Sequence, residues 1–189
     1  MIAVADASPL CYLILIGEID LLPKLFLEVV APQAVIAELL HEDAPEGVRN
    51  WASNLPAWIS TATVDVVTVG LEKLQAGERA AIILAEYIKA DLILLDEKAA
   101  RRVAAERGVR VTGLLGILGE AATRGLVDLP PANRPPQQNY LSMFSGAIEG
   151  HARSVRTIAS VAPPSGRRSA QEVRRRRPPF NVVTGRPSF

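Results

Sequence analysis

Near its start, the chain has a short, wholly apolar run that ends at an aspartate and leads directly into a helix start. Residues 2–5 are apolar at every position, which is typical of a parallel strand covered on both faces. Ser8 followed by Pro9 fits an N-cap with proline at the first helical position. Asp6 is therefore expected at the carboxyl end of a strand, where ligands and chemistry gather in open α/β sheets. A turn or capping role explains this single carboxylate equally well.

The same arrangement recurs later, where the apolar run 92–95 leads to Asp96. Further strands are predicted at 29–31, 58–62 and 109–111, whereas 64–74 is ambiguous. Strands alternating with helices predict a mostly parallel sheet with right-handed crossovers, and so an α/β fold arranged as a three-layer α/β/α sandwich. Apolar periodicity predicts helices at 9–16, 19–26, 32–41, 45–54, 77–85, 98–107 and 113–124.

Length and composition narrow the class of protein. A chain of 189 residues with 49% hydrophobic content suits one globular domain with an appendage. The uncharged apolar run 7–17 is shorter than the roughly 18 residues of a spanning helix. The amino terminus lacks the positive region of a secretory signal, so we expect a cytoplasmic protein with no membrane partner. Cys11 is the only cysteine, which excludes an intramolecular disulfide and a cysteine metal cluster.

The motifs give little support to an enzyme that uses a nucleotide cofactor or a catalytic histidine. Gly113, Gly116 and Gly119 do not have the G-x-G-x-x-G spacing of a phosphate-binding turn, and the chain has no P-loop. His41 and His151 lack a partner pattern with serine, cysteine or metal ligands. The polar chemistry that remains is carboxylate chemistry.

Three carboxylates can converge at the predicted sheet edge: Asp6, Asp96 and Glu78, which lies in the first turn of the helix before Asp96. Crowded carboxylates repel one another and normally need a cation, and hard oxygen ligands suit Mg²⁺ or Mn²⁺. Such an ion can activate a water and neutralise charge on a phosphate, which indicates a phosphodiesterase. Glu78 is also explained as a partner of the helix dipole. Glu38 lies well off the apolar stripe of its helix and fits a solvated position.

Over about residues 1–130 the chain resembles the PIN-domain nucleases, in particular the branch similar to VapC toxins of toxin-antitoxin pairs. The resemblance rests on the order and spacing of five segments. It implies a five-stranded parallel sheet in the order 3-2-1-4-5, which would place the first and fourth strands side by side. The segments are V-A-D-A-S-P-L at 4–10, A-P-Q-A-V-I-A-E-L at 31–39, G-E-R-A-A-I-I-L-A at 77–85, D-L-I-L-L-D-E-K-A-A-R at 91–101 and G-V-R-V-T-G-L-L-G-I-L at 108–118.

The resemblance implies a divalent-metal-dependent endoribonuclease that cleaves single-stranded RNA. The cofactor would be Mg²⁺ or Mn²⁺, and the expected partners besides RNA are a small antitoxin protein and a second copy in a homodimer. Two other functions stay open: a catalytically inactive PIN-like module that binds protein or RNA, and a phosphoacceptor domain. The second is disfavoured because such domains pair two acids after the first strand, whereas Ala7 and Ser8 follow Asp6. The catalytic and metal-binding residues implied are Asp6, Glu38, Glu78 and Asp96.

Accessory roles are expected for neighbours of these acids. Ser8 matches the small hydroxyl residue that the family carries beside the first aspartate, although capping explains it equally well. Glu97 is an accessory acid or an ordinary first-turn glutamate. Lys98, Arg101 and Arg102 either contact RNA phosphate or form a solvated basic helix face.

The charge distribution divides the chain near residue 132. Residues 1–132 hold 11 Lys and Arg against 18 Asp and Glu, a net charge of −7, and residues 133–189 hold 10 Arg against two Glu, a net charge of +8. We predict a PIN-like nuclease domain at 1–132 and a disordered Arg/Pro-rich tail at 133–189. The run 174–177 fits an RNA-binding arm. Alternatively, the absence of lysine from the tail fits GC-rich DNA read in a shifted frame.

Overall fold

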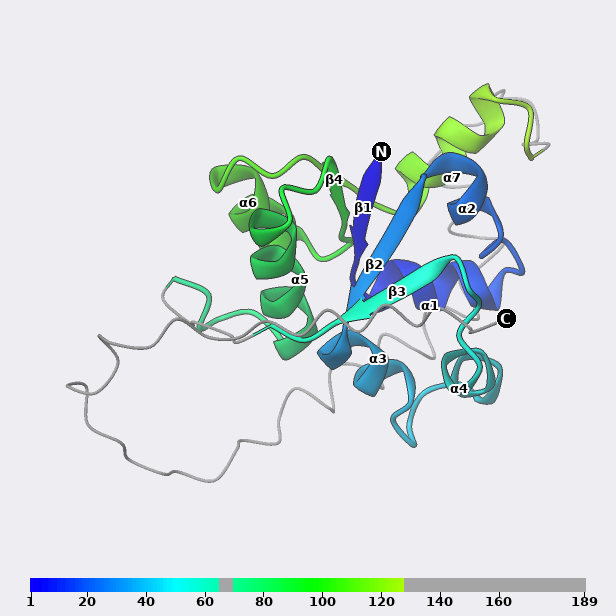
Figure 1. Cartoon of the computed structure of the whole chain (residues 1–189), viewed down its shortest axis with the longest axis horizontal. Coiled ribbons are helices and arrows are strands. Elements are labelled where there is room, and N and C mark those ends of the chain that lie inside the picture. The colour runs from blue at the N-terminus through cyan, green and yellow to red at the C-terminus, as the bar shows by residue number, and fades with distance from the viewer. Residues whose placement is uncertain (65–69, 128–189) are drawn as a thin grey trace, which may run out of the picture.

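A parallel sheet forms the centre of the protein (Figure 1). The computed structural model describes residues 1–64 and 70–127 of the chain. In these ranges the sheet has five strands in the order β3-β2-β1-β4-β5, and every neighbouring pair is parallel. The α/β class and the order 3-2-1-4-5 are confirmed. The strands are β1 (Ile2–Ala5), β2 (Glu28–Pro32), β3 (Ile59–Ala62), β4 (Leu92–Leu94) and β5 (Val111–Thr112).

Helices cover both faces of this sheet, as the wholly apolar strands β1 and β4 require. Alternate residues of a strand point to opposite faces, so Ala3 and Ala5 pack with α1 on one side while Val4 packs with α5 and α6 on the other. Figure 1 shows α5 and α6 on one side of the sheet and α1 and α7 on the other. The helices are α1 (Ala7–Leu15), α2 (Leu21–Leu25), α3 (Gln33–Leu39), α4 (Glu46–Ser53), α5 (Ala76–Tyr87), α6 (Lys98–Glu106) and α7 (Leu114–Thr123).

The start of α1 differs from the prediction. Asp6, not Ser8, occupies the N-cap position, with an extended backbone at φ −88° and ψ 167°. Pro9 is consequently the third helical residue rather than the first. This is tolerated because the first four N–H groups of a helix have no partner within it. The strand predicted at 109–111 also begins later, at Val111.

Part of the sequence-based prediction falls on residues that the structure does not describe. The predicted boundary at 132 and the tail 133–189 lie outside the described residues, as do residues 65–69 of the ambiguous stretch. Within the described part, every helix is too short or too polar to cross a membrane.

Candidate metal-dependent nuclease site

Two of the four predicted acids follow neighbouring strands. Asp6 comes directly after β1, and Asp96 lies two residues after the end of β4. The two strands pair in parallel, with Ala5 opposite Leu94. The backbone N–H of Asp6 continues this pairing by donating to the carbonyl of Leu94 at 3.1 Å. Both aspartates therefore lie at the carboxyl edge of the sheet, as the strand pattern predicts.

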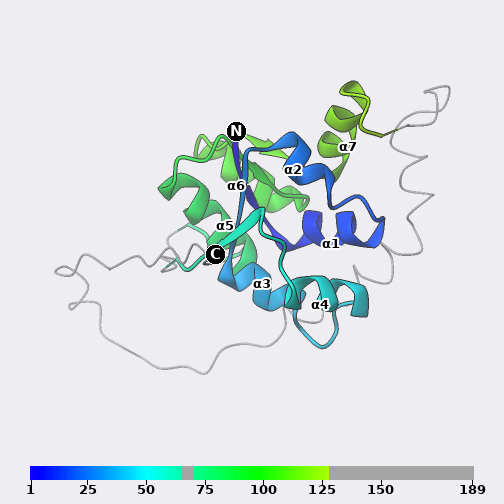
Figure 2. The ribbon, with the colours of Figure 1, turned by 45° about the vertical axis from the view of Figure 1, so that its right-hand side comes forward.

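The two glutamates come from helices that pack against each other at this edge, α3 and α5 (Figure 2). Glu38, on α3, accepts a hydrogen bond at Oε1 from the backbone N–H of Gly77 at 2.8 Å. Glu78 accepts one at Oε2 from the backbone N–H of Gln75, also at 2.8 Å, and completes a capping box at the start of α5. The first turn of α5 thus holds both carboxylates.

Asp6 lies in the most unfavourable position for a negative charge. Its side chain is 3% exposed, and Oδ1 has no hydrogen-bond partner. The pKa of Asp6 is raised to about 8, first by burial and then by the charges of Glu38 and Glu78, while the backbone N–H groups of Ala7 and Ser8 oppose the rise. Asp6, Glu38 and Glu78 are therefore close enough to repel one another.

The two glutamates are also affected by burial. Burial raises the pKa of Glu38, and the charge of Glu78 adds to this, while the Gly77 N–H and Arg79 oppose it. Burial likewise raises the pKa of Glu78, with a contribution from Glu97 and opposition from the Gln75 N–H and Arg79. Glu38 is therefore a member of this acidic cluster, not the solvated residue that helical periodicity indicates.

Asp96 is held from the other side, by the start of α7 and by α6. Its Oδ1 accepts a hydrogen bond from the backbone N–H of Leu114 at 2.9 Å, while its Oδ2 is buried without a partner. Burial raises the pKa of Asp96, and the Leu114 N–H and Arg101 oppose the rise. One carboxylate oxygen is thus fixed by the fold and the other is left available.

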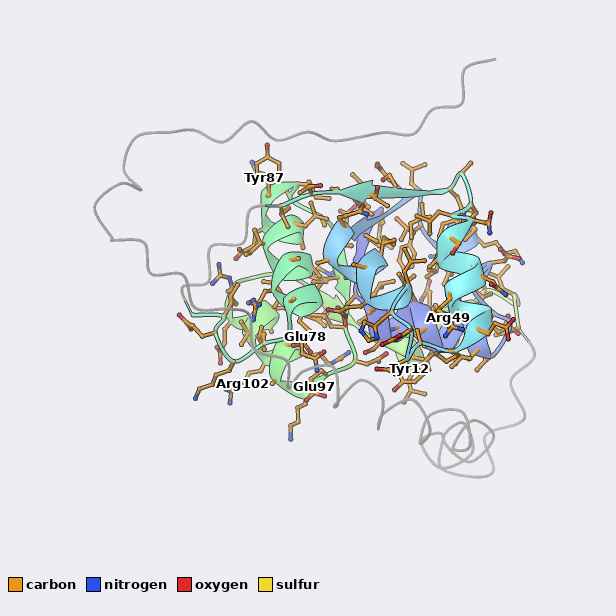
Figure 3. All side chains as sticks on the ribbon, turned by 90° about the horizontal axis from the view of Figure 1, so that it is seen from below. Tyr12, Arg49, Glu78, Tyr87, Glu97 and Arg102 are labelled. Atoms are coloured by element: carbon orange, nitrogen blue, oxygen red, sulfur yellow. The ribbon has the colours of Figure 1, made fainter. Side chains whose placement is uncertain are left out.

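The predicted accessory residues Ser8 and Glu97 lie at different places relative to the acidic cluster. Ser8 lies in the first turn of α1, and its backbone N–H acts on Asp6. Glu97 is exposed at the N-cap position of α6 and forms no capping hydrogen bond. Figure 3 shows Glu97 beside Glu78, with Tyr12 near them and Tyr87 far from the site. Glu97 therefore lies at the margin of the acidic cluster.

The three cations predicted to contact RNA also differ in their exposure and contacts. Lys98 and Arg102 are exposed, and Arg102 pairs with Glu106 at 3.6 Å on the surface of α6. Arg101 is half-buried, and its Nη1 donates to the carbonyl oxygen of Leu95 at 2.7 Å. Its guanidinium therefore contacts the backbone just before Asp96.

Two residues near the site were absent from the sequence-based prediction. Tyr12, on α1, has a pKa raised by burial and then by the charges of Asp96, Cys11 and Glu97. Arg79 donates through Nη1 to the carbonyl of Leu74 and lowers the pKa of both cluster glutamates. Arg79 could have been predicted from its position next to Glu78. Tyr12 could not, because only the packing of α1 brings it near the site.

The oxygen atoms of these carboxylates are chemically suited to bind a hard divalent cation. Asp6 Oδ1 and Asp96 Oδ2 are buried carboxylate oxygens without partners, and oxygen ligands of this kind suit Mg²⁺ or Mn²⁺. Among the described residues, however, no three His, Cys, Asp or Glu side chains are close enough to hold a metal ion as they stand. Rotation of the Glu78 side chain would bring a further carboxylate oxygen toward the aspartates.

The fold and this acidic edge define an α/β protein with a cluster of carboxylates at the carboxyl edge of its sheet. A family model described as DUF3368, a PIN domain, matches residues 2–135. The chain therefore belongs to this PIN-domain family, whose members are generally nucleases that use divalent metal ions.

The remaining comparisons concern curated proteins and solved structures. No curated protein matches the chain. Among solved structures, it is similar to a PilT N-terminus domain protein from the hyperthermophilic archaeon Sulfolobus solfataricus P2. The two are 15% identical with a TM-score of 0.49, and the match covers 71% of this chain and 100% of the other.

Proposed function

We propose that the protein is a divalent-metal-dependent endoribonuclease that hydrolyses phosphodiester bonds of single-stranded RNA. The observation that carries the proposal is that Asp6 and Asp96, at the ends of adjacent strands, each have a buried carboxylate oxygen without a partner. Glu38, which is half-buried, and Glu78, which is buried, add two further carboxylates near Asp6. Leaving the two aspartate oxygens buried and unpaired is costly for a fold unless they bind something.

The four carboxylates, Asp6, Glu38, Glu78 and Asp96, would hold Mg²⁺ or Mn²⁺. When bound, the ion would supply a water of lowered pKa and neutralise charge that grows on the phosphate. Asp6 and Asp96 would supply the buried oxygens, and the first turn of α5 would orient the two glutamates. Lys98 and Arg102 are exposed beside the site and would contact the RNA backbone.

A second candidate function is a PIN-like module that binds RNA or protein without cleaving. It is favoured by the spacing of the acids, because no three potential ligands in the described ranges meet as a ready metal site. Under this alternative, RNA association would survive removal of divalent metal and no cleavage products would form.

Two variants test the proposed function. Asp6→Asn and Asp96→Asn each remove a charge while keeping nearly the same side-chain shape, so we expect both to fold and to lose cleavage. The loss should exceed about a hundredfold if each acid supports the transition state through the metal. Cleavage of a labelled single-stranded RNA would be followed with Mg²⁺, with Mn²⁺ and with excess EDTA, and a duplex would serve as the competing substrate. Full activity in EDTA, or in both variants, would contradict the metal mechanism.

The toxin role rests on the resemblance to the VapC-like branch and is proposed with it. Induced expression should arrest bacterial growth, and Asp6→Asn should abolish the arrest at equal protein level. A small antitoxin would then be sought as a protein that copurifies with the chain and suppresses cleavage. Copurification with a second copy alone would support the expected homodimer instead.

A further inference from the structure

Glu38 reaches the acidic cluster because of a residue 39 positions further along the chain. Its carboxylate lies against Gly77 in the first turn of α5 and accepts the Gly77 N–H at 2.8 Å. A Cβ atom at position 77 would lie 2.8 Å from both Oε1 and Oε2 of Glu38. The carboxylate therefore occupies the space that any other residue would need for its side chain.

Asp96 is seated in the same way at the start of α7. Its Oδ1 accepts the N–H of Leu114 at 2.9 Å. A Cβ atom at position 113 would overlap Asp96 Oδ1, with Arg101 Nη1 at 2.7 Å and the carbonyl oxygen of Leu95 at 3.1 Å. Both glycines have ordinary negative φ angles, so the fold requires them for space and not for an unusual backbone.

Other glycines of the described chain show that this fit is specific. Gly47 and Gly119 are helical, and a Cβ atom at either would have no neighbour within 4 Å. Gly116 faces the hydroxyl of Thr112, which crowds the glycine without involving an acid. Close approach to a carboxylate is found at Gly77 and Gly113.

We propose that Gly77 and Gly113 are positioning residues that seat Glu38 and Asp96 on helix N-termini, so that these two carboxylates are already held at the acidic edge before a metal ion arrives. This inference rests on the proposed nuclease function. The start of a helix carries N–H donors and a partial positive charge, which orient a carboxylate without neutralising its free oxygen. Preorganised ligands bind a metal more tightly than ligands that must first be ordered.

The substitution Gly77→Ala separates positioning from folding. The group in its way is the end of a flexible glutamate, so the fold can persist while the carboxylate moves aside. We expect Gly77→Ala and Gly113→Ala to weaken Mn²⁺ binding by about ten- to a hundredfold, measured by titration calorimetry with the metal alone. In RNA cleavage, kcat should fall more than KM changes. Gly119→Ala and Gly116→Ala should bind Mn²⁺ as the wild type does, because neither adds a methyl group beside an acid.

A second comparison, made in protein that carries Glu38→Ala, tests the positioning role without metal. In metal-free protein, Gly77→Ala should lower the unfolding midpoint when Glu38 is present, and it should not lower the midpoint when Glu38→Ala has removed the carboxylate. If the effect is the same in both backgrounds, or if Gly77→Ala binds Mn²⁺ like the wild type, the positioning role is overturned. A wild type that binds no Mn²⁺ would instead refute the proposed function, and the metal-free comparison would still decide whether Gly77 seats Glu38.

Discussion

At the scale of single residues, the dominant feature is the concentration of buried negative charge around Asp6. A carboxyl group whose pKa is raised in the folded state favours folding while protonated and opposes it once ionised. Burial and the neighbouring glutamate charges raise the pKa of Asp6 to about 8, and burial also raises the pKa values of Glu38, Glu78 and Asp96. All four acids therefore destabilise the metal-free fold as the pH rises.

The variant Asp6→Asn should reverse this pH dependence in part. The contribution of Asp6 is fully present below its unfolded pKa near 4 and is lost as the pH rises through about 8. In EDTA we expect the wild type to lose stability between pH 5 and pH 8, and Asp6→Asn to be the more stable protein at pH 8. The difference should be on the order of 3 to 5 kcal/mol, from a shift of about four pKa units.

Urea unfolding at the two pH values measures this effect. The exposed Asp20→Asn is the matched control and should follow the wild type at both. Mn²⁺ should stabilise the wild type at pH 8 by about 3 kcal/mol when present at a hundred times its Kd, and it should not stabilise Asp6→Asn to that extent. An Asp6→Asn protein that is less stable than the wild type at pH 8 without metal would contradict the proposed electrostatics.

Arg101 and Arg102 are adjacent arginines with different surroundings. Arg101 donates to the Leu95 carbonyl, whereas Arg102 is exposed and pairs with Glu106 on the surface. Arg101→Ala should lower the free energy of unfolding by about 1 to 2 kcal/mol because it leaves a half-buried carbonyl without this donor. Arg102→Ala should change it by less than about 0.5 kcal/mol. Equal stability of the two variants, measured in urea, would argue that Arg101 is free to contact RNA instead.

At the scale of elements, helix starts organise the site. Asp6 occupies the N-cap of α1, Glu38 and Glu78 are bound by the first turn of α5, and Asp96 is bound by the first turn of α7. The positive ends of these helices lower the cost of placing several carboxylates at one edge of the sheet. The arrangement follows from the alternation of strands and helices, because helices that follow parallel strands begin at the carboxyl edge.

Glu78 combines capping with its proposed role as a ligand, and two substitutions separate these roles. Glu78→Gln should keep the bond to the Gln75 N–H, since glutamine also serves in a capping box. We expect it to be at least as stable as the wild type in EDTA, because a buried charge is removed. Glu78→Ala should lose about 1 kcal/mol of the cap's stabilisation relative to Glu78→Gln. Both should bind Mn²⁺ more weakly, measured by calorimetry; wild-type affinity in Glu78→Gln would leave Glu78 a capping residue only.

At the scale of the whole molecule, charge is divided between the two parts of the chain. Residues 1–132, with net charge −7, should repel RNA, whereas the Arg-rich residues 133–189, with net charge +8, should attract it. Truncation after Ala132 should therefore weaken RNA binding at low salt and flatten its salt dependence, with little change in the cleavage of bound RNA. Fluorescence anisotropy of a labelled RNA between about 50 and 200 mM salt measures this.

The truncated protein also tests the proposed division of the chain. An unchanged affinity and salt slope would indicate that the tail does not contribute to RNA binding and would favour a shifted reading frame. Failure of residues 1–132 to fold would show that the boundary is wrong. Circular dichroism of both proteins separates these results.

The sequence by itself determined the parallel sheet and the placement of two aspartates at its carboxyl edge. Wholly apolar runs before Asp6 and Asp96 predict covered parallel strands, and the structure has both strands, paired with each other. This succeeds because strand pattern is local, and because burial on both faces excludes polar residues along the run. The PIN-domain resemblance supplied the order of the remaining strands, which the structure also has.

Only the tertiary structure decided which contacts the side chains around the acids make. Helical periodicity places Glu38 on a solvated face and the family resemblance places it in the site, but the contact that holds it is with Gly77, 39 residues away. Arg101 fits a solvated basic face, yet it turns toward the Leu95 carbonyl. Asp6 takes the cap position that the Ser8–Pro9 pair indicates for Ser8. In each case the deciding contact joins the residue to a strand end or to another helix, and a pattern confined to one helix contains no information about that partner.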